Sequence, residues 1–194
     1  MFAVKQAIQA KMAIRGLVMD AYIQWVSQNP IFSACVQFAI LGSLGEIVAA
    51  SVVNKRPALP CSWLQMLGKV VAWAILGVVI KYGFAGMKGF TTALLDHHML
   101  PRLFSDGAGF AFALSVFTNG LFGPQMMLFH RFEDNLILGA KGYAGIEKAL
   151  KTLLWFWIPA HTITFCLPTP FQIGLAAIWG LVLGLILGLS KKSA

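Results

Sequence analysis

Long apolar stretches separated by short groups of charged residues dominate the chain. Residues 31–53 contain one charged side chain, Glu46, and residues 108–129 contain none. A helix needs about 20 apolar residues to cross a hydrocarbon core of about 30 Å. We therefore predict a transmembrane helix over each range, the first beginning near Pro30, because proline suits the first turn of a helix.

The C-terminal part has the longest uncharged stretch, residues 152–190. A single helix of that length would extend about 58 Å, nearly twice the hydrocarbon core. Pro168 and Pro170 favour a turn inside it. The pattern therefore predicts two helices, 146–166 and 171–190, and leaves open whether the first crosses fully, because its first residues are charged.

A further span over 66–95 contains lysines. A central lysine costs about 2.5–3.5 kcal/mol on the insertion scale, and each Leu or Ile returns about 0.3–0.6 kcal/mol. The apolar residues around Lys81 outweigh that cost, and Lys88 is expected to extend its ammonium to an interface.

The fold class that follows is all-α, a polytopic transmembrane helix bundle of four to five spans plus an N-terminal amphipathic helix. Residues 1–29 form that helix, and residues 30–194 form the bundle. Five spans place four basic residues on one side and eight on the other, whereas loss of 146–166 gives six against six. Because membrane proteins usually show such a bias, five spans are favoured.

Composition supports a lipid environment. The chain is 58% hydrophobic and 11% charged, against about 25% charged residues in soluble domains. The net charge of +8 favours anionic lipid headgroups as partners. The basic residues form no run, which argues against nucleic acid.

The N-terminal segment has two compatible interpretations. Apolar residues follow helical spacing from Val4 to Trp25, with Lys5, Lys11 and Arg15 between them. This pattern is typical of a helix on a membrane surface. It also resembles an uncleaved mitochondrial targeting segment.

Glu46 is the only acidic residue inside a predicted span, and an ionisable group at that depth is a functional candidate. We expect Lys81 or Lys88 to be its partner. A buried ion pair and a solute or proton pathway are both open.

His161, Thr162 and Thr164 follow Pro159 in a predicted span. Because proline frees a backbone carbonyl, these side chains either satisfy the local backbone or line a polar pore. Trp155 and Trp157 are typical of interfacial anchors.

The sequence indicates neither a cofactor nor a metal site, and no enzyme motif is present. The three cysteines form no metal-binding pattern, and His97 and His98 are expected in a solvated loop. The last helix has glycines at four-residue intervals, which predicts close contact inside the bundle or between subunits: Gly180, Gly184 and Gly188.

Several of these features together resemble the Mpv-seventeen and 22-kDa peroxisomal membrane protein family. Over nearly the whole chain, the order and spacing of the similar residues are those of the family. Two polar residues of the family pattern are replaced: Thr162 stands in place of its Gln, and Thr164 or Phe165 in place of its Asn. The similar residues are Tyr22, Pro30, Leu44, Gly45, Glu46, Gly86, Leu95, Asp96, Pro101, Asp106, Gly109, Phe110, Ala111, Trp157, Pro159, Phe165, Pro170, Leu189 and Ser190.

The resemblance implies an integral organellar membrane protein, in the inner mitochondrial membrane or else a peroxisomal or plastid membrane. It implies a non-enzymatic role as a small-solute channel or in membrane homeostasis. The alternative is a structural accessory subunit of a larger membrane complex, such as a respiratory or energy-converting assembly. Other membrane subunits or further copies of the chain are the protein partners expected.

Overall fold

The computed structural model describes residues 2–190, without the side chains of residues 2–5, 7–10, 13 and 187–190. Every regular element in residues 2–190 is helical, which confirms the all-α class. Three helices are long and apolar enough to cross a membrane: Pro30–Asn54, Trp63–Asp96 and Thr169–Ile186.

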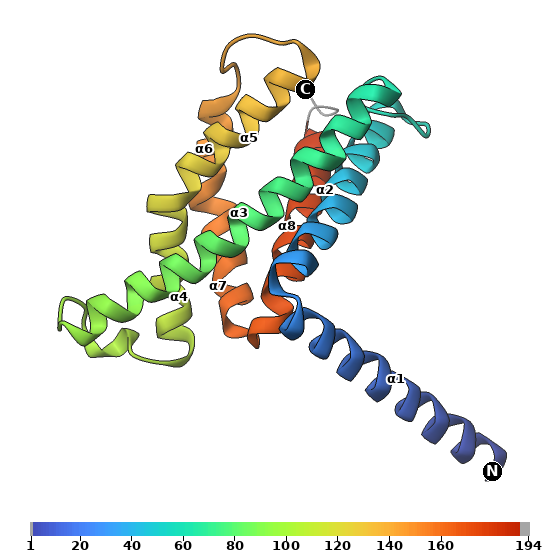
Figure 1. Ribbon diagram of the computed structural model, residues 1–194, viewed down its shortest axis with the longest axis vertical. Helices are drawn as coiled ribbons and strands as arrows, with labels where there is room; N and C mark the ends of the chain where they lie inside the picture. The colour runs from blue at the N-terminus through green and yellow to red at the C-terminus, as the bar shows by residue number, and fades with distance from the viewer. Residues whose placement is uncertain (1, 191–194) are drawn as a thin grey trace.

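The chain begins with α1 (Phe2–Gln28), which projects away from the other helices (Figure 1). One residue, Asn29, separates it from α2 (Pro30–Asn54), so the break falls where Pro30 predicts it. The Tyr22 hydroxyl donates to Gln37 Oε1 at 2.9 Å, and its ring stacks on Phe171. These contacts hold the last turns of α1 against the bundle.

An antiparallel hairpin joins α2 to α3 (Trp63–Asp96). Ser62 and Gln65 form a capping box at the start of α3, which satisfies its first backbone N–H groups. A Cβ on Gly77 would lie 2.5 Å from the carbonyl oxygen of Ala34. Glycine is therefore needed where α3 crosses α2.

The third predicted span forms a helical run over residues 107–138, and the fourth forms a run over residues 146–166. A π-helical turn interrupts each run. A short 3₁₀ turn precedes the first run. The segments are η1 (Arg102–Phe104), α4 (Gly107–Phe117), η2 (Thr118–Phe122), α5 (Gly123–Leu138), α6 (Ile146–Thr152), η3 (Leu153–Trp157) and α7 (Ile158–Cys166).

The turn predicted at Pro168 lies between α7 and α8 (Thr169–Ser190), as expected from the prolines. α8 packs mainly against α2, and α4 packs against α7. α3 runs diagonally between these two groups (Figure 1) and contacts both. Its 34 residues extend about 51 Å, more than a hydrocarbon core requires.

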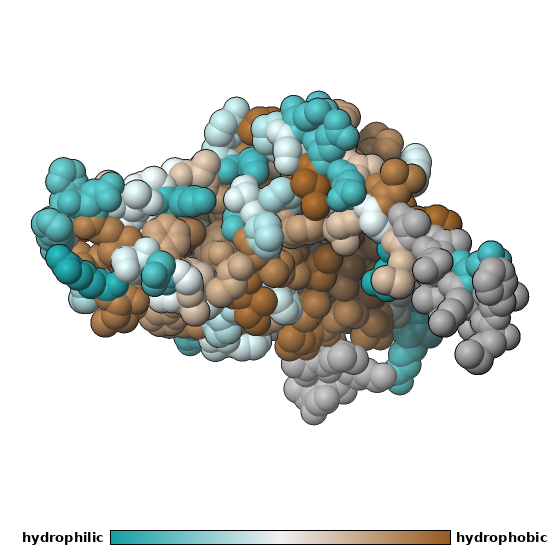
Figure 2. Space-filling view, turned by 90° about the horizontal axis from the view of Figure 1, so that it is seen from below, coloured by the Kyte–Doolittle hydropathy of each residue, from teal (hydrophilic) through white to brown (hydrophobic). Residues whose placement is uncertain are grey.

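The outer surface is rich in large apolar side chains. Phe32, Leu64, Val71 and Leu154 are all more than half exposed. Figure 2 shows apolar residues across the middle of the face seen from below and hydrophilic residues toward its margins. A lipid-facing helical protein has this distribution, because its exterior is solvated by hydrocarbon.

Candidate functional site

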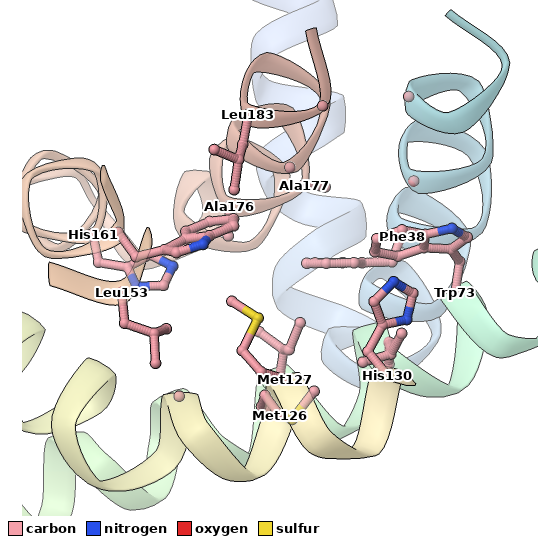
Figure 3. Close-up of a pocket in the computed structure, with 18 of the residues that line it drawn as sticks. Phe38, Trp73, Met126, Met127, His130, Leu153, His161, Ala176, Ala177 and Leu183 are labelled. Carbon is pink, nitrogen blue, oxygen red and sulfur yellow. The ribbon is translucent and has the colours of Figure 1, made fainter. Parts of the chain in front are cut away.

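The two helix groups line a partly open cavity of about 340 Å³. This size lies within the range of small-molecule sites, about 300–1,000 Å³. Figure 3 shows His161 and His130 on opposite sides of it, with Met126 and Met127 between them. Most of the wall is apolar, and its members with polar side-chain atoms are Glu46, Trp73, Thr118, Asn119, His130, Trp157 and His161.

The two π-helical turns pack against each other at one side of this cavity. Each turn comes directly before a proline near the start of the next helix, Pro124 after η2 and Pro159 after η3. Because proline has no N–H, the ordinary helical hydrogen bond cannot form there. The preceding turn is wound as a π-helix in both cases. Turns of this kind are frequent at functional sites.

A hydrogen-bonded chain links the two π-turn regions. Ser115 Oγ donates to the carbonyl oxygen of Ile158 at 2.7 Å. Asn119 Nδ2 donates to the carbonyl oxygen of Ser115 at 2.8 Å, and Asn119 Oδ1 lies 3.2 Å from His161 Nδ1. The rings of Phe84, Trp157 and Phe165 surround the imidazole.

Two polar atoms in the same part of the wall have no partner. Thr118 Oγ1 and Trp157 Nε1 are buried and make no hydrogen bond within the described structure. An unsatisfied buried donor costs about 1–3 kcal/mol. Such groups at a cavity indicate a place where a ligand or ordered water would bind.

The other side of the cavity contains an ionic cluster. Lys69 Nζ lies 2.7 Å from Glu46 Oε2 and 2.8 Å from Asp134 Oδ1. Trp73 Nε1 donates to Glu46 Oε1 at 2.8 Å. Both oxygens of Glu46 are therefore occupied, which favours a structural role for this residue.

The prediction that Lys81 or Lys88 pairs with Glu46 was wrong. The partner of Glu46 is Lys69, and neither Lys81 nor Lys88 forms an ion pair within the described residues. The antiparallel hairpin explains this, because Glu46 lies two turns before the end of α2 and meets the first turns of α3. Lys81 lies twelve residues beyond Lys69, about 18 Å farther along the helix. Lys88 is exposed.

Glu46, His130 and Asp134 bring their donor atoms within 4.8 Å of one another, as metal ligands would. Lys69 Nζ already lies between the two carboxylates. Its ammonium supplies the positive charge that a metal ion would bring. The cluster is better described as an ion network joining α2, α3 and α5.

The two threonines satisfy their own helix. Thr162 Oγ1 donates to the carbonyl oxygen of Ile158 at 2.7 Å, and Thr164 Oγ1 donates to that of Ala160 at 2.9 Å. The local interpretation fits both residues, whereas His161 lines the cavity. The interfacial assignment fits Trp155, which is exposed, but was wrong for Trp157, which lies in the cavity wall.

Inside the described bundle, the glycine row of α8 does not make a close helix contact, and the contact between subunits stays a prediction. A Cβ on Gly180 would meet nothing within 4 Å, and one on Gly184 would meet only ordinary contacts at 3.9 Å, because both line the cavity. Close α2–α8 approaches occur instead at Gly45, where a Cβ would lie 3.3 Å from Leu181 Cα, and at Gly174, where it would lie 2.5 Å from Gln37 Oε1. The surroundings of Gly188 lie outside what the structure describes.

Sequence reasoning missed Asp134. Asn119 and His130 gave only a weak signal of an interior helix face, because their spacing is loose. Asp134 lies beyond the predicted span 108–129, and only the unbroken continuation of α5 brings it to Lys69. The prolines at 124 and 159 were a usable signal, because each follows a π-turn in the wall.

Searches of protein families, curated proteins and solved structures found no match to this chain.

Proposed function

We propose that the chain is a five-span, non-enzymatic protein of the inner mitochondrial membrane, of the Mpv-seventeen type, whose central cavity binds or passes a small molecule. The observation that carries the proposal is a cavity of about 340 Å³ between apolar helices. Helices that pack only for stability have no need of such a space, because each void forfeits contacts.

The span count rests on two further helical runs besides the three long apolar helices. The run over residues 146–166 has 21 residues and a length of about 31 Å, enough to cross. Both runs contribute residues to the cavity wall, which supports placing them in the same membrane-embedded body as the three long helices.

A cavity-filling variant tests the role. Gly180→Leu places a side chain in open space, and Gly86→Leu is the matched control, because Gly86 also has nothing within 4 Å but lies outside the cavity wall. The purified proteins are reconstituted in proteoliposomes and tested with a graded series of small neutral solutes. We expect wild type and Gly86→Leu to conduct or bind these solutes, and Gly180→Leu to lose most of that activity. Equal activity in all three proteins would refute the proposal.

An accessory subunit of a larger complex is the alternative, and α1 favours it. α1 projects from the bundle (Figure 1) with Met12, Leu17 and Val18 more than half exposed. A neighbouring subunit or a lipid surface would cover them. A native-mass measurement of the detergent-extracted protein distinguishes these roles: a stoichiometric larger assembly supports the subunit role, and an isolated chain excludes it.

A further inference from the structure

The hydrogen bonds around Asn119 determine which nitrogen of His161 carries the proton. Asn119 Nδ2 donates to the carbonyl oxygen and to Oγ of Ser115. If the Asn119 amide were reversed, its Oδ1 would lie 2.8 Å from the carbonyl oxygen of Ser115, and two acceptors would face each other. Asn119 Oδ1 must therefore face His161. An amide oxygen only accepts, and His161 Nδ1 is therefore the donor.

The remaining nitrogen of His161 is consequently an acceptor. The imidazole is surrounded by aromatic rings, and an unpaired charge in such surroundings is costly, so the ring is neutral. Nε2 then carries a lone pair, and it has no protein donor among the described residues. The Trp157 ring lies 5.0 Å from the His161 ring, measured between centroids, and Thr118 belongs to the same cavity wall. Trp157 Nε1–H and the Thr118 hydroxyl both lack partners among the described residues.

An acceptor and unpaired donors in one wall match a neutral group that both donates and accepts, and a hydroxyl is the smallest organic group of this kind. A carbonyl or ether could not donate to His161 Nε2. A carboxylate or ammonium would bring an unpaired charge, because the acidic cluster is already engaged by Lys69. The apolar remainder of the wall suits an apolar body.

Entry from the lipid is consistent with the arrangement of helices. α5 and α8 line opposite walls of the cavity and make little direct contact with each other. Gly180 and Gly184 contribute no side chain to the part of the α8 wall on either side of Leu183. An apolar molecule dissolved in the bilayer could pass between these two helices.

We infer that the cavity binds an apolar molecule bearing a hydroxyl group, with the hydroxyl held by His161 Nε2, Thr118 and Trp157. This inference names the ligand class of the cavity and rests on the proposed function.

Two probes that differ only in the hydroxyl test it: hydroxymethylanthracene and methylanthracene. Energy transfer from the cavity tryptophans to anthracene reports binding to the purified full chain in lipid nanodiscs. We expect the hydroxylated probe to bind roughly tenfold more tightly, as one added hydrogen bond gives. Gly180→Leu should remove this binding, and Gly86→Leu should retain it.

Two variants test the polar contact. His161→Phe should abolish the preference for the hydroxylated probe while methylanthracene still binds. Thr118→Val is nearly isosteric, removes a hydroxyl that has no partner among the described residues, and should reduce the preference for the hydroxylated probe. This variant keeps the test available if His161→Phe fails to fold.

The outcomes separate the two claims. Equal binding of both probes, blocked by Gly180→Leu, would overturn the hydroxyl contact and leave the proposed binding cavity intact. Binding that Gly180→Leu does not change, or no binding of either probe, would also overturn this inference, whereas solute flux blocked by Gly180→Leu would still support the proposed function.

Discussion

At the scale of single residues, the paired and unpaired polar atoms distinguish structural groups from candidate contacts. Glu46 and Lys69 are fully engaged in the ionic cluster. Thr162 and Thr164 bond their own helix. Thr118 and Trp157 are left unpaired in the cavity wall, so the burial of an unsatisfied group, more than its polarity, indicates where a ligand would bind.

Glu133 provides a pH-dependent test at this scale. It lies beyond the predicted span 108–129, and burial, helped by the neighbouring Asp134, raises its pKa to about 7. A raised carboxyl pKa means that the folded protein binds the proton more tightly than the unfolded chain. Stability from this group is therefore complete below about pH 4.5 and is lost as the pH rises through 7.

We expect the melting temperature of the wild type to fall between about pH 5 and pH 8. Glu133→Gln should flatten this part of the profile, since its amide does not titrate. Melting followed by circular dichroism in detergent at several pH values would check this, and an unchanged slope in the variant would count against the buried carboxyl.

At the scale of elements, prolines and the hairpin decide which residues meet. Pro124 and Pro159 accompany the π-turns that form one wall of the cavity. The short connection between α2 and α3 sets their antiparallel register. That register brings Glu46 to Lys69 and Trp73, which are one helical turn apart.

Replacing Lys69 tests the register. Lys69→Met leaves two carboxylates in the cluster without a counter-ion, and breaking a buried pair in this way costs about 3–5 kcal/mol. Lys81→Met should cost far less, because Lys81 has no ion-pair partner within the described structure. Unfolding in a denaturing-detergent titration would compare them, and similar losses in the two variants would disprove the assigned partner.

At the scale of the whole molecule, the diagonal α3 joins two helix groups (Figure 1). The central cavity lies between these groups. Whether the run over 146–166 crosses the membrane determines the topology. Cys61 lies between α2 and α3, and Cys166 is exposed at the end of α7. Five spans place these two thiols on opposite sides of the membrane, whereas four place them on the same side.

Single-cysteine variants that retain either Cys61 or Cys166, with the other two cysteines replaced by serine, should therefore react differently. In sealed vesicles of one orientation, an impermeant maleimide should label one and spare the other until detergent is added. Burial raises the pKa of the Cys61 thiol, so labelling is best done at mildly alkaline pH. Labelling of both in intact vesicles would exclude five spans.

The sequence alone determined which stretches are apolar helices and that the chain breaks near Pro30 and Pro168, because hydrocarbon solvation and proline act locally. The helix bounds at Pro30 and over 146–166 follow from those two effects. Contacts between segments depended on the tertiary structure. Register and helix continuation bring Asp134 to Lys69, direct Gly180 toward open space, and set His161 beside Asn119, and none of these follows from the spacing of residues within one helix.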